Sequence, residues 1–419
     1  MRPPGGNGIH LFKGAYMKIS HNPRNVRTLV LCALCLFGVT ACGGGSSGGT
    51  STSSSSGGSG GGSGATAGSA GFVFVSNPNS GRLDSYGYTS SGTIGSLAGY
   101  QNLPSFQGTV GRARPVTDPT DSLVFVTTNG SSTNEEWSYV YSATTGLMSG
   151  GLSNTSVATQ GTPQGMPIDP IDHFGLSVGT TGIDAFAYNT STGALASTST
   201  NTTFTTSNVV TADLLNHWLF VVSGTTLSDY AINPTTEAIS TTPTSSVTIS
   251  ALSGATNVDN DQDVAHGILF LIIQGANTSL VPVPYNVTTG IFGTPAATTG
   301  FSGTVSSPCS DSNNVDPTNN LLFLQNNSTG AFGIYAYNSS TGAIGAAAMP
   351  FTSLPIAGGC AALDTSNRLL FFLNNSTASA PYGLISATYP TTGASVTQVN
   401  GVNGMALGTL TERATTTHH

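Results

Sequence analysis

Charged side chains are scarce in this sequence. Only 7% of its 419 residues are Asp, Glu, Lys or Arg, against roughly 25% in an ordinary soluble domain. No lysine follows Lys18, and from Cys42 onward five arginines against 18 acidic residues give a net charge of −13. So few cations cannot neutralise a row of phosphates, which excludes nucleic acid as a partner. The absence of lysine also excludes a Schiff-base or phosphate-loop lysine from that region.

The sequence also lacks the Ala, Glu, Lys and Leu periods of coiled coils and helical bundles. It contains 54 Gly and 21 Pro, and 38% of its residues are hydrophobic. That hydrophobic fraction is sufficient for a core and argues against disorder of the whole chain. The composition therefore indicates β-structure rich in Thr, Ser, Asn and Gly, outside the cytosol.

The first 41 residues have the features of an export signal. We interpret residues 1–16 as an over-extended start before Met17, and 17–41 as a signal peptide with a basic beginning and an apolar run. That run, Thr28 to Val39, has 12 residues, whereas a membrane-spanning helix needs about 20. It therefore suits the apolar segment of a secretory signal.

The apolar run ends in Val39-Thr40-Ala41-Cys42. This sequence resembles the lipobox of bacterial lipoproteins, and the resemblance implies that the Cys42 thiol carries a lipid; the alternative is an ordinary signal peptide with an incidental cysteine. Residues 42–70 then form a tether in which Gly and Ser fill 22 of the 28 positions after Cys42, and such a segment is a flexible coil. Gly43 in place of Asp after the cysteine favours the outer membrane, by the same resemblance. We therefore expect an extracytoplasmic protein held at the outer membrane or cell surface through acyl chains.

The rest of the chain is repetitive, with a period of about 49 residues. An Asp is followed seven positions later by Phe or Leu six times, and these repeat aspartates are Asp118, Asp169, Asp213, Asp263, Asp316 and Asp364. Each Asp opens a polar turn, an apolar run such as Leu321-Leu322-Phe323-Leu324 follows, and a Thr/Ser-Thr-Gly turn comes later in most units. Apolar runs of this kind predict strands buried on both faces.

The repeat predicts an all-β fold, a seven-bladed β-propeller with four antiparallel strands per blade. Residues 71–419 accommodate about seven units, and a seventh apolar run, at 72–75, has no Asp before it. The first blade therefore lacks its innermost strand. We expect the segment 404–410 to supply that strand and close the ring, which removes open sheet edges. The propeller then spans 71–410, and 411–419 is a tail.

The repeated wording Asp-Pro-Thr, Leu-Leu-Phe and Tyr-Asn-x-x-Thr-Gly-Ala resembles the seven-bladed propellers of the lactonase (6-phosphogluconolactonase-like) family and the related YVTN surface propellers. The resemblance covers residues 71–410 and implies the fold. Lactone hydrolysis in that family would require His, Arg and Glu together on the face formed by the connections between blades and between second and third strands. The candidates on this face are Arg112, Arg114, Glu135, Glu136, Asp259, Asp261 and Asp311, with no histidine among them. The alternative for the two arginines is a role as surface charges. We place Glu135 and Glu136 at the tip of the loop between second and third strands, where the alternative is a solvated loop.

Three histidines, His173, His217 and His266, fall three or four residues after a repeat Asp, in the turn between the first and second strands of successive blades. The interpretation is polar turn residues; the alternative is a histidine metal site, which requires turns of adjacent blades to converge within bonding distance. Asp259, Asp261 and Asp263 alternate, and spaced acids can hold Ca²⁺. Their alternative role is a polar entry into a strand. No other cofactor is expected.

Cys309 and Cys360 lie 51 residues apart, about one repeat. A disulfide between them is allowed in an oxidising compartment; the alternative is two unpaired buried thiols, because their offsets from the repeat Asp differ.

The sequence supports three hypotheses about function. The first is a lipid-anchored propeller that binds a small molecule, glycan or protein, or acts as a scaffold; its motivation is a complete fold without a convergent catalytic set. The alternative is a lactonase-type hydrolase acting on a sugar lactone, motivated by the family resemblance. A Ca²⁺-stabilised adhesive module is a third hypothesis.

Overall fold

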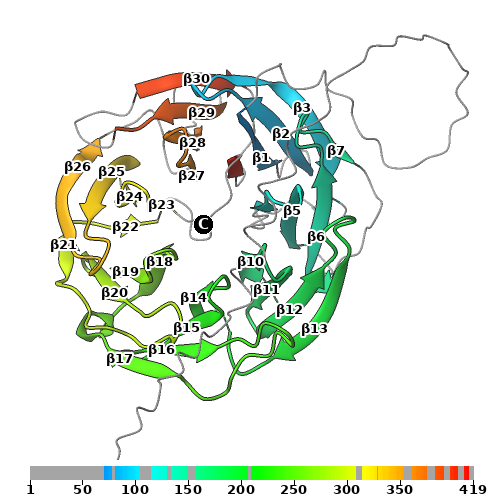
Figure 1. The fold of residues 1–419 in the computed structure, drawn as a ribbon. Coiled ribbons are helices and arrows are strands. Elements are labelled where there is room, and N and C mark those ends of the chain that lie inside the picture. The colour runs from blue at the N-terminus through cyan, green and yellow to red at the C-terminus, as the bar shows by residue number, and fades with distance from the viewer. Residues whose placement is uncertain are drawn as a thin grey trace, which may run out of the picture. The chain divides into compact units, whose positions relative to one another are not determined.

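The computed structural model describes residues 70–77, 81–103, 115–129, 134–149, 157–161, 163–165, 167–205, 209–307, 314–327, 329–352, 361–374, 383–390, 397–403 and 410–414. They form seven antiparallel sheets, the blades, arranged in order around a central axis (Figure 1). All lie within one compact unit, residues 56–419. The prediction of a seven-bladed β-propeller is confirmed.

The strands of each blade run outward in chain order, except that the C-terminal strand β31 is the innermost strand of blade 1. Blade 1 contains β31 (Leu410–Ala414), β1 (Gly71–Asn77), β2 (Arg82–Tyr88) and β3 (Ile94–Asn102). Blade 2 contains β4 (Pro115–Asp118), β5 (Leu123–Asn129), β6 (Asn134–Tyr141), β7 (Met148–Ser149) and β8 (Val157–Ala158). Blade 3 contains β9 (Pro163–Gly165), β10 (Ile168–Asp169), β11 (Phe174–Gly179), β12 (Gly182–Tyr188) and β13 (Leu195–Asn201). Blade 4 contains β14 (Val209–Asp213), β15 (Trp218–Ser223), β16 (Thr226–Ala231) and β17 (Ser245–Thr248), followed by a short 3₁₀ helix, η2 (Ser250–Leu252).

The remaining three blades follow the same order. Blade 5 contains β18 (Asn257–Asp263), β19 (Ile268–Gln274), β20 (Thr278–Pro284) and β21 (Thr299–Phe301). Blade 6 contains β22 (Val305–Ser306), β23 (Val315–Asp316), β24 (Leu321–Asn326), β25 (Ala331–Tyr337) and β26 (Ile344–Thr352). Blade 7 contains β27 (Ala361–Asp364), β28 (Leu369–Asn374), β29 (Gly383–Thr388) and β30 (Thr397–Asn403). Where a blade has five strands, two short ones share one neighbour: β7 and β8 both pair with β6, β9 and β10 with β11, and β22 and β23 with β24.

The core lies between neighbouring blades. The second strand of each blade carries the apolar run, and its central aromatic side chain has no exposed surface in six blades, at Phe74, Phe125, Phe220, Phe270, Phe323 and Phe371. Each run packs on both neighbours; Phe72 and Phe74 of blade 1, for example, share a cluster with Val124 and Trp137 of blade 2. Burial on both faces explains why these strands lack a polar/apolar alternation.

The ring closes with the C-terminal strand, as predicted, but at a later position. The strand β31 spans Leu410–Ala414 and pairs with β1 from Gly71↔Ala414 to Val75↔Leu410. Four residues assigned to the tail therefore belong to the propeller, while 404–409 lie outside the described residues. The physical reason is register, because the closing strand is the segment that pairs with β1. The prediction from the sequence had relied on the apolar residues at 405–407 instead.

In the part of the chain that the structure describes, no helix has the length and apolarity required to cross a membrane. The signal segment 17–41, Cys42 and the tether lie outside that part.

Candidate functional site

The six repeat aspartates share one kind of contact, and five of them make a second. The Oδ1 atom accepts backbone N–H groups of the turn that follows; Asp316 Oδ1, for example, accepts from Asn319 N at 3.1 Å. The Oδ2 atom accepts a tyrosine hydroxyl from the next blade in five cases, which are Tyr88–Asp364 (2.9 Å), Tyr188–Asp118 (2.9 Å), Tyr285–Asp213 (2.7 Å), Tyr337–Asp263 (2.6 Å) and Tyr389–Asp316 (2.9 Å). Each aspartate thus fixes its own turn, and five of the six also fix the adjoining blade through the tyrosine.

We call each of these Tyr–Asp contacts between blades a tyrosine latch. The tyrosine was not identified from the sequence. The tyrosine is the last residue of the third strand of its blade or the residue directly after it, and the next turn follows, as in Tyr188-Asn189 and Tyr337-Asn338. That repeated dipeptide was the available signal. Only the tertiary structure shows that its hydroxyl crosses to the preceding blade.

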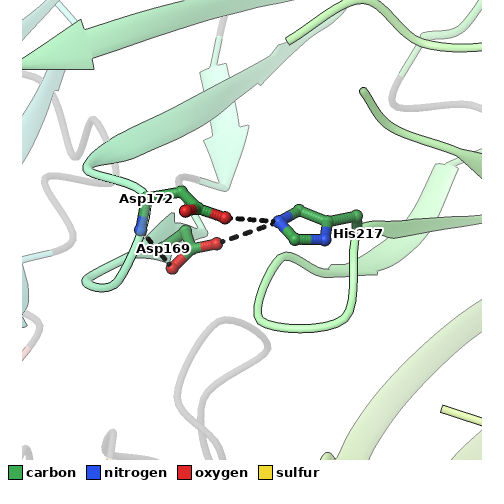
Figure 2. A group of neighbouring side chains, drawn as sticks. All are labelled: Asp169, Asp172 and His217. Carbon is green, nitrogen blue, oxygen red and sulfur yellow. Dashed lines mark hydrogen bonds and ion pairs between the residues drawn. The ribbon is translucent and has the colours of Figure 1, made fainter. Parts of the chain in front are cut away.

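Blade 4 departs from the pattern, because Ile232 stands where the other blades have tyrosine. At the interface between blades 3 and 4, which we call a seam like the other blade interfaces, His217 of blade 4 approaches blade 3 instead (Figure 2). Its Nε2 lies 2.9 Å from Asp172 Oδ2 and 3.4 Å from Asp169 Oδ2. These carboxylates raise the pKa of His217 above its ordinary value, with Asp169 contributing most, whereas burial opposes the rise. The turns of adjacent blades therefore do converge here, contrary to the expectation from sequence.

The two other turn histidines have simpler surroundings. His173 occupies the same turn position in blade 3 as His217 in blade 4, both with φ near +60° (59° and 65°). Its Nε2 lies 3.4 Å from one carboxylate, that of Asp121. His266 sits one position earlier in its turn and its Nδ1 lies 2.6 Å from Asp263 Oδ2.

The alternating acids of β18 do not meet at one point. Asp263 is engaged by Tyr337 and His266 in the turn. Asp259 and Asp261 face blade 6, where the backbone N–H of Ser307 donates to Asp259 (3.0 Å) and that of Asn314 donates to Asp261 (3.0 Å). Burial raises the pKa of Asp261 well above its ordinary value.

Within the described ranges, the one group of three metal-ligating side chains is Asp169, Asp172 and His217. The candidate calcium ligands Asp259, Asp261 and Asp263 thus form no common cluster, because Asp259 and Asp261 serve a blade interface and Asp263 serves a turn.

Glu135 and Glu136 lie within strand β6 rather than at the tip of a loop. Glu136 is completely buried, and its two oxygens accept hydrogen bonds from Thr127 Oγ1 (2.6 Å) and, across the blade interface, from Ser177 Oγ (2.6 Å). Burial raises the pKa of Glu136 to about 7. This carboxyl is a structural group between blades 2 and 3, out of reach of a substrate in this arrangement.

The remaining candidate residues lie outside the described residues: Arg112, Arg114, Asp311, Cys309, Cys360 and Cys42. The arginine site, the disulfide and the lipid attachment stay predictions.

A pocket of about 470 Å³ opens between blades 5 and 6. It lies where β21 leads to the next blade and where β24 turns into β25, on the face of the candidate residues. Phe301 and Phe351 belong to the outermost strands, β21 and β26, whereas the sequence predicted a site at the mouth of the central channel. Its lining combines aromatic rings with neutral polar groups: Gly300, Phe301, Ser302, Asn326, Thr329, Ala331 and Phe351. The volume falls within the ordinary range for small-molecule sites.

The aromatic wall of this pocket is a packed cluster. The rings of Phe301 and Phe351 have centroids 5.9 Å apart, and both contact Tyr335, at 5.3 and 5.8 Å. Gly333 permits this packing, since a Cβ there would lie 2.9 Å from Tyr335 and 3.1 Å from Phe351.

Comparison with solved structures decides the kind of fold. The chain shares the fold of lactonase-like seven-bladed propellers. The periplasmic gluconolactonase of Pseudomonas aeruginosa superposes with a TM-score of 0.60 at 10% identity, over 83% of this chain and 99% of that one. A Bacteroides fragilis protein assigned provisionally as a 6-phosphogluconolactonase gives 0.57 at 12% identity, over 82% and 97%. A Lactobacillus plantarum protein gives 0.55 at 11%, over 82% and 98%. No family model and no curated protein matches the sequence.

Proposed function

We propose that this protein is an extracytoplasmic ligand-binding propeller that takes a neutral carbohydrate in the pocket between blades 5 and 6. The observation that carries the proposal is the lining of that pocket. Phe301 and Phe351 offer ring surface on which the C–H face of a sugar can pack, and Ser302, Asn326 and Thr329 offer hydroxyl and amide groups. A few placed polar groups among apolar ones are typical of small-molecule sites.

The absence of ionisable side chains among the lining residues favours an uncharged ligand. None of the seven lining residues is ionisable, so a charged ligand would lose its hydration without gaining a partner. A neutral sugar exchanges hydrogen bonds with water for hydrogen bonds with neutral groups at a smaller cost.

The test is a glycan-array screen followed by titration of the best sugar with Phe351→Ala. Removing one ring should weaken binding about tenfold or more, because a buried aromatic contact contributes roughly 1–3 kcal/mol. Ile291→Ala is the matched control, since Ile291 is an exposed apolar residue (57%) outside the pocket. Equal affinity of Phe351→Ala and wild type would refute the pocket as the site.

Lactone hydrolysis is the second candidate, supported by the fold shared with a gluconolactonase. Both candidate functions involve a sugar ligand, so the observation that separates them is whether the protein hydrolyses it. Purified protein should then open a sugar lactone faster than buffer, and Arg112→Ala or Arg114→Ala should abolish the excess rate. A rate equal to that of buffer removes this candidate and leaves the binding proposal intact.

We further propose that Cys42 anchors the protein in the membrane through lipid, on the strength of the Val39-Thr40-Ala41-Cys42 sequence. Cys42→Ala should move the protein from the membrane fraction to the soluble fraction. Cys35→Ala, a cysteine within the signal segment, is the control and should leave fractionation unchanged. Membrane attachment of Cys42→Ala would contradict lipidation at this residue.

A further inference from the structure

The seam between blades 3 and 4 differs from the other seams at one atom, Asp169 Oδ2. In blades 4, 6 and 7 the corresponding oxygen receives a side-chain amide from three residues further on; these contacts are Asn216–Asp213 (2.8 Å), Asn319–Asp316 (2.7 Å) and Asn367–Asp364 (2.7 Å). It also receives the tyrosine hydroxyl of the next blade. In blade 3 the amide is replaced by Asp172 and the tyrosine by Ile232. Both ordinary donors are therefore missing.

The result is a buried carboxylate oxygen that accepts no hydrogen bond. Asp169 is buried, and its Oδ1 accepts the turn N–H groups of Ile171 (2.7 Å) and Asp172 (3.1 Å). Its Oδ2 accepts no hydrogen bond and has only the 3.4 Å ion pair with His217 Nε2. Leaving such an oxygen unsatisfied is costly. Facing it are the Oδ2 of Asp172 and the Nε2 of His217 (Figure 2).

We propose that Asp169, Asp172 and His217 bind a divalent transition-metal ion of the zinc class, which joins blade 3 to blade 4. One imidazole nitrogen and two carboxylate oxygens are a ligand set that Zn²⁺ accepts, whereas Ca²⁺ and Mg²⁺ prefer oxygen ligands alone. The distances of 2.9 and 3.4 Å from His217 Nε2 to the two oxygens are close to the edges, roughly 3.3 Å, of a tetrahedron with metal–ligand bonds of about 2.0–2.1 Å.

The surroundings hold the ligands in place and leave access from solvent. The imidazole of His217 stacks on Phe174 of blade 3 with an interplanar angle of 13°. The Asp172 side chain is 34% exposed, whereas those of His217 and Asp169 are 13% and 1% exposed. An ion can therefore enter from the side of Asp172, and a water molecule would complete its coordination. A bound ion requires neutral imidazole and ionised carboxylates, so any proton that these groups hold leaves to the buffer.

The test is isothermal titration of the metal-free full-length protein with ZnCl₂, together with the zinc-induced shift in melting temperature. His418 and His419 are replaced by Ala in all samples, so that the terminal histidine pair does not bind zinc. The protein with only these two replacements should bind one equivalent of zinc with proton release. Zinc should also raise its melting temperature. His217→Asn should bind at least tenfold more weakly; Asn occupies the same turn position in blade 6, at φ 52°.

Asp172→Asn and His173→Asn make the test specific. Asp172→Asn removes a ligand but restores the amide donor found in blades 4, 6 and 7, so it should raise the melting temperature without zinc and abolish the zinc-induced shift. His173→Asn is the matched control, since this residue shares the turn position and backbone of His217 but faces one carboxylate; it should bind zinc as the wild type does. The proposal is overturned if the wild type takes up no zinc, or if His217→Asn and His173→Asn bind it equally well.

Discussion

A single hydroxyl group links each pair of blades in the tyrosine latches. The Tyr188 hydroxyl, for example, donates to Asp118 Oδ2 (2.9 Å) and lies 3.0 Å from the Asp169 carbonyl oxygen. Removing it leaves a fully buried carboxylate oxygen without that donor, and a charged acceptor stripped of its partner costs more than a neutral one.

We predict that Tyr188→Phe lowers the free energy of unfolding by about 1–3 kcal/mol, measured by urea denaturation. Tyr335→Phe is the control, because the Tyr335 ring packs in the pocket wall while its hydroxyl has no hydrogen bond to any described residue. Equal losses in the two variants would show that the ring, rather than the latch, provides the stability.

Glu136 gives the protein a pH dependence at the residue scale. Its pKa in the folded protein is about 7, raised by burial from 4.5. The folded state therefore binds the proton more tightly than the unfolded state, so the stabilisation is complete below pH 4.5 and is lost as the pH rises through 7.

Glu136→Gln should therefore abolish this decline and be the more stable protein at pH 8, by on the order of 3 kcal/mol. Urea denaturation of both proteins at pH 5 and pH 8 measures the difference. Glu135→Gln, at the neighbouring and partly exposed position of β6, should follow the wild type. Parallel pH profiles for wild type and Glu136→Gln would contradict the assignment.

At the scale of the element, the turn between third and fourth strands packs its glycine against the preceding blade. Gly342 of blade 6 has φ 73°, and a Cβ there would lie 2.6 Å from Pro282 and 2.8 Å from Ile268 of blade 5. Gly224 also has a positive φ of 59°, but no atom lies within 4 Å of its Cβ position. Comparing Gly224 with Gly342 therefore separates the cost of backbone strain from the cost of steric crowding.

We predict that Gly224→Ala costs about 1–2 kcal/mol of stability, from the left-handed backbone alone. Gly342→Ala should cost roughly 1–3 kcal/mol more, because two blades must separate to admit the methyl group. Thermal denaturation of the two variants tests this, and equal costs would show that the turn does not set the blade spacing.

The elements differ in how much the sequence revealed of them. The apolar runs and the repeat Asp predicted the second strands and the turns before them, because burial on both faces and turn chemistry leave local marks. Glu135 and Glu136 were placed in a loop, since two adjacent acids read as solvated. They lie in β6 because Thr127 and Ser177 provide hydrogen bonds inside the interface, and such partners are invisible along the chain.

At the scale of the whole molecule, the ring depends on five residues near its C-terminus. The strand β31 supplies the inner strand of blade 1, which would otherwise expose the edge of β1. An open edge also invites pairing with other chains.

Deletion of residues 410–419 should therefore lower the melting temperature by roughly 5 °C or more and promote aggregation, as seen by calorimetry and light scattering. Deletion of 415–419, beyond the strand, is the control and should have little effect. If both deletions melt like the wild type, closure by β31 contributes nothing to stability.

The low charge of the chain also has its meaning at this scale. Six acids are repeat aspartates that build turns and seams, and Asp259, Asp261 and Glu136 lie inside blade interfaces. Much of the negative charge is therefore structural, and the pocket between blades 5 and 6 has a neutral lining.

The sequence by itself determined the repeat, the number of blades and the buried second strands, because these depend on local turn chemistry and on apolar runs within one unit. It also supplied the expectation of a lipidated Cys42. The tertiary structure decided which side chains meet: the tyrosine latches, the convergence of Asp169, Asp172 and His217, and the pocket beside Phe351. Each of these brings together residues of different blades, roughly one repeat or more apart, and such contacts depend on how neighbouring sheets pack rather than on any pattern along the chain.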